Sequence, residues 1–222
     1  GFHGTSHRYV SARALEFLGM KAEGTKVVTA HIGNGGSLAA VVDGKCVDTT
    51  MGLTPLEGVM MGTRSGDIDG GAVAFIQKKL GLDADGISDL LNKKSGIAGL
   101  TGLSSDMRDI ENAANAGNER AQIAQDSYFY RIKKYVGAYA AAMGGIDVLV
   151  FTAGVGENQT PMREDVCRGL EFMGIKIDAE KNAKIRGEEA IISTPDSRVK
   201  VVVIPTDEEL MIASDTMALI SK

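Results

Sequence analysis

The stretch KVVTAHIGNGGSLAAVVDGKCVDTT, residues 26–50, decides the fold. Its pattern predicts three short antiparallel strands: Lys26–Ile32, 37–42 and 45–50. Asn-Gly and Asp-Gly pairs join them, and such pairs are typical of hairpins because mirror-image turns need a positive φ at both central residues. The first turn has more glycine around Asn34 than a hairpin needs: Gly33, Gly35 and Gly36. Glycine lets backbone N–H groups approach a phosphate closely, so this turn is a candidate phosphate-binding loop.

Composition describes an ordinary globular protein. The chain has 222 residues, of which 44% are hydrophobic and 24% charged, enough for one large domain or two small ones. The net charge of −5 disfavours nucleic acid and anionic membranes as partners, and no apolar run approaches the roughly 20 residues that span a bilayer. Cys46 and Cys167 lie far apart in the sequence, which predicts no disulfide framework and a reducing, cytoplasmic location. The sequence opens on Gly1 without an initiator Met, so we expect part of a longer protein.

Outside residues 26–50 the sequence alternates between helical periodicity, loops and buried-type strands. Ser6 is expected to cap a helix over residues 7–18. A long segment without an evident element, residues 51–69, is a candidate functional loop. Helices are then predicted at Gly70–Leu80, 84–94, 104–116, Glu119–Met143, 160–173, 179–186 and Glu208–Ile220. Strands are predicted at 146–152, 175–177 and 199–204.

This order predicts an α/β fold. Antiparallel hairpins form one side of a mixed sheet of about five strands, parallel crossovers form the other side, and helices cover both faces. In Glu119–Met143, apolar residues at helical spacing indicate the face that packs on the sheet, and they include Ile123, Tyr130, Tyr135 and Tyr139.

Two glycine-rich turns follow predicted strands, one at residues 31–37 and the other at 154–158. Ligands of open α/β sheets bind at the carboxyl ends of strands, so the pair is more suggestive than either turn alone. Neither turn is a Walker loop, and the second lacks the third glycine of a dinucleotide fingerprint. An ordinary turn is the better interpretation of each one taken singly.

Several polar residues are candidates for chemistry. His3 and His7 have a spacing that could bind zinc on a helix, but no third ligand is evident, so an anion contact or a satisfied core histidine is favoured. Arg64 stands in a glycine-framed loop and is either a clamp on phosphoryl oxygens or a solvated surface residue. The acids from Asp207 to Glu209 follow a strand and begin a helix, where they either cap the helix or hold magnesium.

Five segments taken together resemble the acetokinase family of the sugar kinase and actin superfamily. They are FHGTSH, HIGNGGS, MGLTPLEGVMMGTRSGD, FTAGVGEN and IPTDEEL, and they cover essentially the whole chain in order. The resemblance implies a ribonuclease-H-like lobe of the actin-like ATPase type. It also implies reversible phosphoryl transfer from ATP to acetate, giving acetyl phosphate and ADP, with Mg²⁺ or Mn²⁺, in a homodimer.

The resemblance also implies roles for individual residues. His3 and Arg64 correspond to transition-state stabilisers, and Glu208 to the magnesium ligand. The residues that correspond to the nucleotide site are His31, Ile32, Gly33, Asn34, Gly35, Asp106, Met107, Arg108, Gly154, Val155, Gly156, Glu157 and Asn158.

The resemblance covers the C-terminal nucleotide-binding lobe of the family, at residues 1–222, and none of its N-terminal lobe. We therefore expect this chain alone to bind nucleotide weakly and to be inactive, with the helix at 207–221 packing on the lobe that is absent. Two alternatives stay open. One is a propionate or butyrate kinase, and the other is a non-catalytic nucleotide-binding or dimerisation module of the same superfamily.

Overall fold

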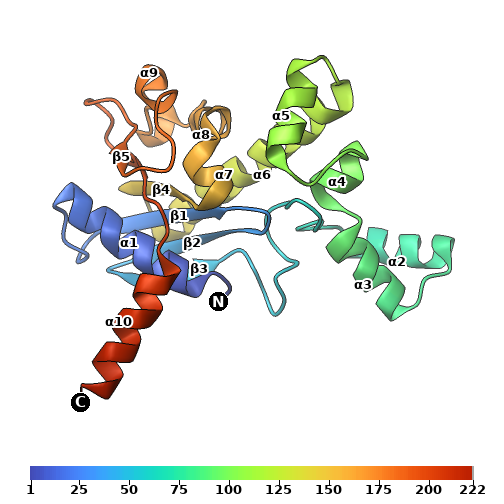
Figure 1. The fold of residues 1–222 in the computed structure, drawn as a ribbon, viewed down its shortest axis with the longest axis horizontal. Helices are drawn as coiled ribbons and strands as arrows, with labels where there is room; N and C mark the ends of the chain where they lie inside the picture. Colours follow the sequence, from blue (N-terminus) through green and yellow to red (C-terminus); the bar gives the residue numbers. More distant parts are fainter. Residues whose placement is uncertain (222) are drawn as a thin grey trace.

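A six-stranded mixed sheet forms the centre of the computed structural model, which describes residues 1–221; Lys222, the last residue of the predicted lobe, lies outside the described residues (Figure 1). The strand order is β3-β2-β1-β4-β6-β5. The strands are β1 Lys26–Ile32, β2 Gly36–Val42, β3 Lys45–Thr49, β4 Val148–Thr152, β5 Ala190–Ile191 and β6 Lys200–Val203. Strand β2 pairs antiparallel with both β1 and β3. Strand β4 pairs parallel with both β1 and β6, and β5 pairs antiparallel with β6. The predicted mixed α/β sheet is confirmed. The predicted strand at 175–177 is wrong, because Ile175 and Ile177 form only isolated bridges, and the sixth strand is instead β5, which is too short for a sequence pattern to reveal.

The helices follow the predicted order. They are α1 Gly4–Leu18, α2 Gly70–Leu80, α3 Ala84–Lys93, α4 Gly96–Thr101, α5 Met107–Asn115, α6 Glu119–Met143, α7 Ala153–Asn158, α8 Thr160–Cys167, the 3₁₀ turn η1 Glu171–Met173, α9 Ala179–Asn182 and α10 Glu208–Ile220. The predicted helix over 160–173 is wrong in length, because α8 ends at Cys167 and Gly169 adopts a positive φ. The predicted helix over 179–186 likewise covers only α9, and α4 was not predicted.

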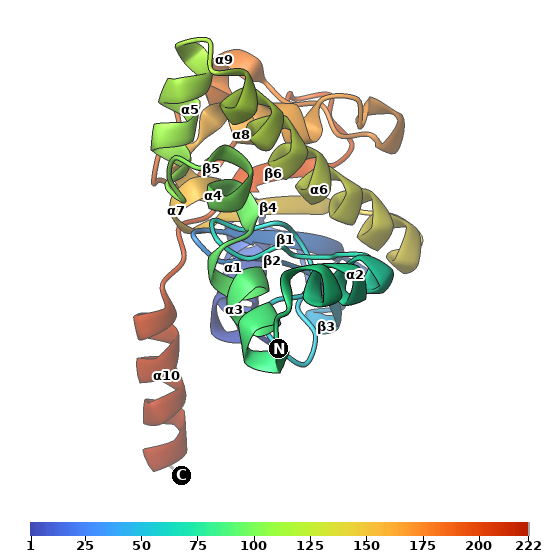
Figure 2. The ribbon, with the colours of Figure 1, turned by 90° about the vertical axis from the view of Figure 1, so that its right-hand side faces the viewer.

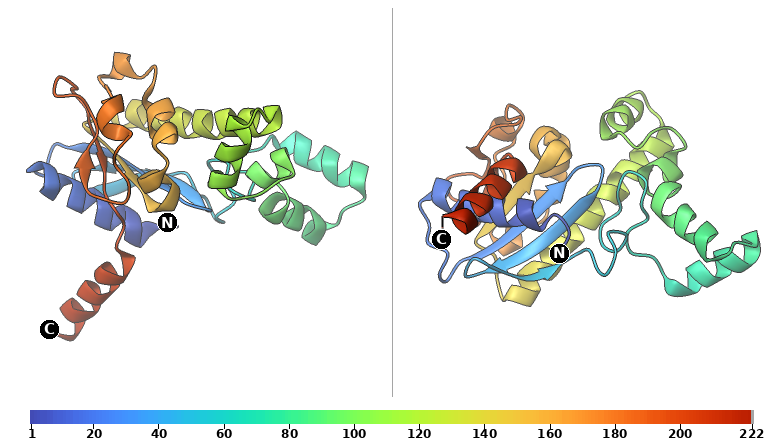
Figure 3. Two further views of the ribbon diagram at one scale, coloured as in Figure 1. Left: turned by 45° about the horizontal axis from the view of Figure 1, so that its top comes forward. Right: turned by 60° about the horizontal axis from the view of Figure 1, so that its bottom comes forward.

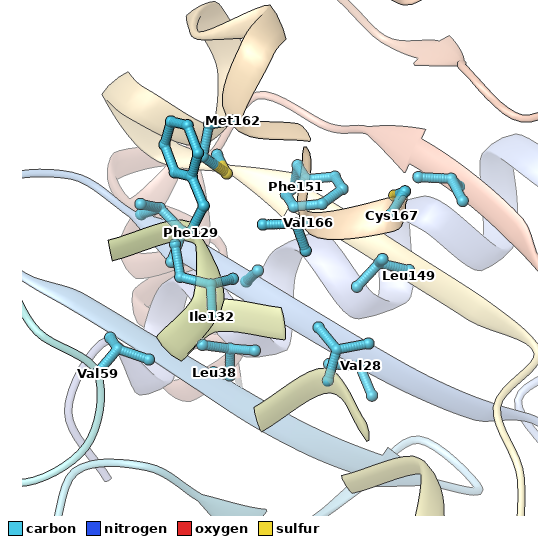
Figure 4. Packing of buried hydrophobic residues seen from close by; sticks show 14 of the residues in the cluster. Val28, Leu38, Val59, Phe129, Ile132, Leu149, Phe151, Met162, Val166 and Cys167 are labelled. Carbon is cyan, nitrogen blue, oxygen red and sulfur yellow. The ribbon is translucent and has the colours of Figure 1, made fainter. Parts of the chain in front are cut away.

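Helices cover both faces of the sheet. Helix α1 packs on one face, where its residues Val10, Ala14 and Leu15 meet Val27 and Val150. Helices α6 and α8 pack on the other face, where Phe129, Ile132, Met162 and Val166 contact the sheet (Figure 4). Strands β1 and β4 are buried on both faces, which explains their nearly continuous apolar sequences.

The predicted apolar face of α6 is partly wrong. Tyr139 is buried, but Ile123 and Tyr130 are 62% and 59% exposed. The buried stripe is formed instead by residues that include Phe129, Ile132 and Val136. Apolar residues occur on more than one side of this long helix, and only packing against β1 and β2 selects the buried side.

The two predicted hairpin turns differ in conformation. Asp43 and Gly44 both have positive φ, as a mirror-image turn requires. Asn34 and Gly35 do not, so the mirror-image interpretation of the first turn is wrong. The glycines there answer to close contacts with other loops, which are described below.

Two parts of the molecule extend from the sheet. Helix α10 points away from the body, with its apolar residues exposed (Figure 2). Helices α2 and α3 project at another side, and α2 has no buried residue (Figure 3). Across the described residues, no helix has both the length and the apolar character that crossing a membrane requires.

Candidate functional site

A cavity of about 800 Å³ opens beside the carboxyl ends of β1 and β4. This volume lies in the range of small-molecule sites, and the strand ends are where α/β sheets bind ligands. The lining residues come from the first glycine turn, the start of α5, α6 and the region of α7. They are Gly33, Asn34, Gly62, Ser105, Asp106, Met107, Arg108, Glu111, Tyr128, Gly154, Val155, Asn158, Gln159 and Arg186.

Three segments predicted to bind nucleotide therefore meet at one cavity, although they are far apart in the sequence. The predicted residues that line it are Gly33, Asn34, Asp106, Met107, Arg108, Gly154, Val155 and Asn158. Five others do not line it: His31, Ile32, Gly35, Gly156 and Glu157. The side chain of Ile32 enters the core under α6, whereas His31 lies on the α1 face, since neighbouring strand residues point to opposite faces.

Glycine in the first turn is required by close approach. A Cβ at Gly35 would lie 3.3 Å from Arg64 Nη1, and one at Gly36 would lie 3.2 Å from the Val59 side chain. Gly62 N donates to the Asn34 carbonyl at 3.1 Å, which joins the turn to the loop that carries Arg64. The extra glycine therefore lets two loops meet.

The second glycine-rich segment is a helix and not a turn. Strand β4 ends at Thr152, Ala153 adopts a φ of 66°, and α7 begins there. Gly154 lines the cavity, and a Cβ there would meet no other residue within 4 Å. Gly156 faces the sheet, where a Cβ would lie 3.5 Å from the Ala30 carbonyl oxygen. One glycine thus keeps the cavity open, and the other lets α7 pack closely.

The Glu157 carboxylate fixes the chain around α7. Its Oε1 accepts from Ala153 N at 2.7 Å and from Thr206 N at 3.1 Å. These bonds join the start of α7 to the segment that leads into α10. The structure therefore gives Glu157 a loop-fixing position, away from the cavity lining.

The start of α5 forms another wall. Asp106 caps the helix by accepting from Arg108 N at 2.9 Å, and its carboxylate also accepts from the Arg108 guanidinium. These hydrogen bonds lower the pKa of Asp106 to about 2. Both side chains are largely solvent-exposed, so the ion pair orients the wall more than it stabilises the fold.

Buried Arg163 connects the two walls that carry Val155 and Arg186. Its guanidinium makes five hydrogen bonds and is fully buried. The acceptors lie at the end of α7 and around α9: the carbonyls of Gly156, Glu157, Asn182 and Ile185, and Asn182 Oδ1. Burial, and then the nearby charge of Arg186, lowers the pKa of Arg163 to about 10, so the side chain remains charged at neutral pH.

Arg64 and His3, the two predicted stabilisers, both lie beside Gly35. A Cβ at Gly35 would lie 3.3 Å from Arg64 Nη1 and 3.8 Å from His3 Nε2. Arg64 Nη1 donates to the Pro55 carbonyl at 3.4 Å, and no described carboxylate pairs with it. The predicted functional loop therefore presents a cation with spare donors next to the glycine turn.

The loop that carries Arg64 is anchored on α6 through Asp67. Tyr135 donates its hydroxyl to Asp67 Oδ2 at 2.5 Å, and Gly58 N donates to Asp67 Oδ1 at 2.8 Å. Burial, then the hydrogen bond with Asp67, raises the pKa of Tyr135. The long loop without helix or strand is thus held by specific bonds.

All three histidines lie together on the α1 face. The rings of His3 and His31 stack with centroids 3.9 Å apart, and His7 lies edge-on to both. His31 Nδ1 lies 2.8 Å from the hydroxyl of Ser6, which also contacts Thr206. Ser6 is a buried residue inside α1, so its predicted capping role is wrong; His3 precedes the helix with a φ of 54°.

Burial lowers the pKa of each histidine. For His7, burial and then the neighbouring His31 and His3 lower it to about 3, and for His31 burial and then His3 lower it to about 3. For His3, burial also lowers the pKa, the negative charge of Glu208 opposes the shift, and the Arg64 charge adds to it. All three imidazoles are therefore neutral at pH 7.

We expect the free energy of unfolding to fall steeply as the pH drops from 6 to 5. The unfolded chain binds a proton on each histidine below pH 6.5, whereas native His7 and His31 remain neutral until about pH 3. Each proton taken up on unfolding contributes a slope of about 1.4 kcal/mol per pH unit. Stability is therefore fully present above pH 6.5 and is lost as the pH falls toward 3.

Urea unfolding at several pH values measures this slope. In His7→Gln the slope between pH 6 and 5 decreases by about 1.4 kcal/mol per pH unit, whatever the absolute stability of the variant. An unchanged slope would show that His7 is already protonated in the native state.

Glu208, the predicted magnesium ligand, is the first residue of α10, and Asp207 caps this helix by accepting from Leu210 N at 2.8 Å. Thr206, two residues before Glu208, lies 2.7 Å from the Ser6 hydroxyl, which places the start of α10 beside the three histidines. Within residues 1–221 no cluster of three or more His, Cys, Asp or Glu side chains could enclose a metal. One carboxylate fits a magnesium ion that is held mainly by water and phosphates, and it does not fit a fully protein-bound metal.

Six cavity residues were not predicted as site residues from the sequence: Gly62, Ser105, Glu111, Tyr128, Gln159 and Arg186. Gln159 donates to Glu111 Oε2 at 3.1 Å, while its own Oε1 is buried and has no hydrogen-bond partner among the described residues. Tyr128 also belongs to the hydrophobic core. Glu111, Tyr128 and Arg186 lie in no motif that the sequence indicated, so only their position in space indicates a role.

Comparison with known proteins agrees with this geometry. The residue pattern that describes the Acetokinase family matches residues 1–214. The chain belongs to the acetokinase family. It is 70% identical over 222 residues to the acetate kinase of Bacteroides fragilis, covering 100% of this chain and 56% of that protein. This member of the acetokinase family thus spans about half the length of the curated relatives that it matches.

Solved structures of other family members have the same fold. The crystal structure of Porphyromonas gingivalis acetate kinase matches with a TM-score of 0.98 and 62% identity, over 99% of this chain and 55% of that one. A propionate kinase from Francisella tularensis matches with a TM-score of 0.89 and 43% identity, over 97% of this chain and 54% of that one. The ribonuclease-H-like, actin-like lobe that the sequence predicted is confirmed.

Proposed function

We propose that this chain forms the nucleotide-binding part of an acetate kinase, which transfers a phosphoryl group from ATP to acetate and gives acetyl phosphate and ADP. The observation that carries the proposal is that Arg64 and His3 both lie beside Gly35, in the turn whose neighbouring residues line the 800 Å³ cavity. Nucleoside and phosphates would occupy this cavity, with the terminal phosphate directed toward Arg64.

The chemistry needs positioning and charge stabilisation more than a nucleophilic side chain. A carboxylate oxygen of acetate attacks the terminal phosphorus, and the bond from that phosphorus to the bridging oxygen of ADP breaks. Arg64 supplies a delocalised charge to the equatorial oxygens, and His3, near the same position beside Gly35, supplies a neutral hydrogen-bond donor. Backbone N–H groups of the first glycine turn are available to the other phosphates.

Glu208 is the residue that would hold Mg²⁺, or Mn²⁺ in its place. When bound together with the nucleotide, the ion neutralises charge on the phosphate oxygens. The first turn of α10 positions this carboxylate, and its negative charge reaches His3.

The proposal predicts different behaviour for two forms of the protein. The first form is the 222-residue chain. The second, called the extended enzyme below, is this chain joined to the remaining segment of the Bacteroides fragilis acetate kinase, which is 70% identical over the shared part. We expect the chain to bind MgATP in calorimetry without turnover, and the extended enzyme to form acetyl phosphate, trapped with hydroxylamine, only when ATP and acetate are both present. Near-normal turnover by the 222-residue chain, or none by the extended enzyme, would contradict this.

A propionate kinase is the second candidate, because a propionate kinase is 43% identical over 97% of this chain. The extended enzyme, assayed with acetate, propionate and butyrate, ranks the three acids. If kcat/KM is higher for propionate or butyrate than for acetate, that acid is the preferred substrate, and the proposal of phosphoryl transfer still holds.

The same proposal assigns the exposed regions. We expect the apolar side of α10 to pack against the segment that corresponds to the rest of the relatives' sequence, of which this chain covers 56%. The support is that Ile212, Leu219 and Ile220 are 59%, 70% and 72% exposed here. A homodimer, implied by the family resemblance, is supported by exposed apolar residues on α2, Phe75 and Leu80. A cytoplasmic location is supported by two unpaired cysteines.

A further inference from the structure

A continuous line of hydrogen bonds runs from strand β1 to the ring of His3. Thr29 Oγ1 lies 2.7 Å from His7 Nδ1, and His7 Nε2 lies 2.7 Å from Ser37 Oγ. Ser37 Oγ in turn lies 2.9 Å from His3 Nδ1. Thr29 and Ser37 are fully buried, and His7 is 5% exposed, so bulk water does not supply alternative partners.

The protons in this line have three arrangements in which every bond is made. In the first, Thr29 donates to His7 Nδ1, His7 Nε2–H donates to Ser37, and Ser37 donates to His3 Nδ1. In the second, every bond is reversed, so that His3 Nδ1–H donates to Ser37 and Thr29 accepts from His7. In the third, both imidazoles donate to Ser37 and Thr29 donates to His7. Only the first leaves the proton of His3 on Nε2, because a neutral imidazole carries one proton.

The two buried hydroxyl groups decide among them. Thr29 Oγ1 has no hydrogen-bond partner other than His7 among the described residues, and Ser37 Oγ has none other than His3 and His7. The Thr29 proton in the second arrangement and the Ser37 proton in the third are therefore buried without an acceptor, whereas in the first every proton in the line is used. An unmade bond of a buried donor favours the first arrangement by roughly tenfold or more.

The first arrangement matters because of where the other edge of His3 points. Nε2 of His3 lies 3.8 Å from the position of a Cβ at Gly35, and Arg64 Nη1 lies 3.3 Å from the same position. Stacking on His31 at 3.9 Å fixes the plane of the ring. We propose that Thr29, His7 and Ser37 are positioning residues that hold His3 in the Nε2–H tautomer, so that a proton faces the space beside Arg64. This rests on the proposed function for its purpose, because a donor there suits a transferring phosphoryl group.

The imidazole ¹⁵N shifts of the 222-residue chain report the tautomers directly. The chain has only three histidines, so long-range ¹H–¹⁵N spectra at pH 7.5 resolve each ring. We expect His3 and His7 both to show an unprotonated Nδ1 and a protonated Nε2. A protonated Nδ1 on His3 overturns the inference.

A variant separates the line from simple packing. In Thr29→Val the shape is kept and the donor is lost, so the His3 shifts move toward an average of the two tautomers although residue 29 does not contact His3. Thr29→Ser restores the unsubstituted pattern. Thr101→Val, the same change at a buried threonine whose hydroxyl bonds to Ile97 O in α4, leaves the His3 shifts unchanged. If Thr29→Val is folded and the His3 ¹⁵N shifts are unchanged, Thr29 does not set the tautomer.

Kinetics of the extended enzyme test the purpose of the arrangement. Thr29→Val is expected to lower kcat by about two- to fivefold, in proportion to the fraction of His3 that loses the Nε2–H tautomer, with KM for ATP changed less than twofold. If Thr29→Val changes the ¹⁵N shifts as expected but leaves kcat unchanged, the catalytic purpose is overturned and the tautomer assignment stands. An extended enzyme without any turnover defeats the proposed function instead, because the spectra need no substrate.

Discussion

Replacing Arg64 by alanine in the extended enzyme is expected to lower kcat by about a thousandfold, with KM for ATP changed only a few-fold. A charge that stabilises the equatorial oxygens of a transferring phosphoryl group typically contributes 10³–10⁵ in rate. Arg64 is suited to this because Gly35 leaves room beside Nη1 and no described carboxylate neutralises it. Arg64→Lys recovers only part of the rate, since an ammonium group cannot present the planar fork.

The matched control is Arg168→Ala. Arg168 lies on the surface just after α8 and pairs with Glu164 and Asp165, away from the cavity. Its loss should leave kcat within twofold, because exposed ion pairs contribute little to the fold. Equal kcat values for Arg64→Ala and Arg168→Ala would refute the role of Arg64.

Replacing Arg163 by methionine is expected to destabilise the chain by about 3–5 kcal/mol, because several buried acceptors lose their donors at once. The five bonds of the guanidinium hold the end of α7 against the segment around α9. The Arg163 guanidinium has no carboxylate partner among the described residues. Its N–H groups donate to carbonyl oxygens at helix ends, which carry partial negative charge. Urea unfolding at pH 7.5 measures the loss.

The comparison is with Arg13→Met. Arg13 forms a bidentate pair with Glu189, but its side chain is 32% exposed. Removing this partly exposed pair should cost much less than removing the buried guanidinium of Arg163. Where Arg163→Met remains folded, MgATP binding should weaken as well, since Val155 and Arg186 line the cavity from the two segments that Arg163 joins. Similar losses of stability in the two variants would show that burial of Arg163 adds nothing.

Several elements could be predicted because their signals are local. The bounds of β1, α2, α6 and α10 in the structure are those the sequence indicated, since capping residues, terminal glycines and apolar periodicity act within a few residues. The mirror-image turn at Asp43 and Gly44 was predictable for the same reason. The site residues were predicted from the family resemblance, because whole motifs of the family occur in this chain in order.

Other features depended on contacts that no local pattern contains. Gly35 and Gly36 look like ordinary hairpin glycines, but they also allow the close approach of the loop that carries Val59 and Arg64. Ser6 resembles a helix cap, yet it lies inside α1 against His31. Residues 154–158 resemble a loop and form α7, because Ala153 changes the chain direction and Gly156 packs on the sheet. In each case partners from distant segments chose among conformations that the local sequence allows.

By itself, the sequence determined the order of most elements, the mixed α/β class, and which charged residues and glycine-rich segments were candidates for the site. Only the tertiary structure decided which of these residues meet. It brought Arg64 and His3 together beside Gly35, placed Glu111, Tyr128, Gln159 and Arg186 in the cavity, and buried Arg163 between α7 and α9. The physical reason is that propensity and capping act over one or two turns, whereas a site is made by side chains that converge from strands and loops far apart in the chain.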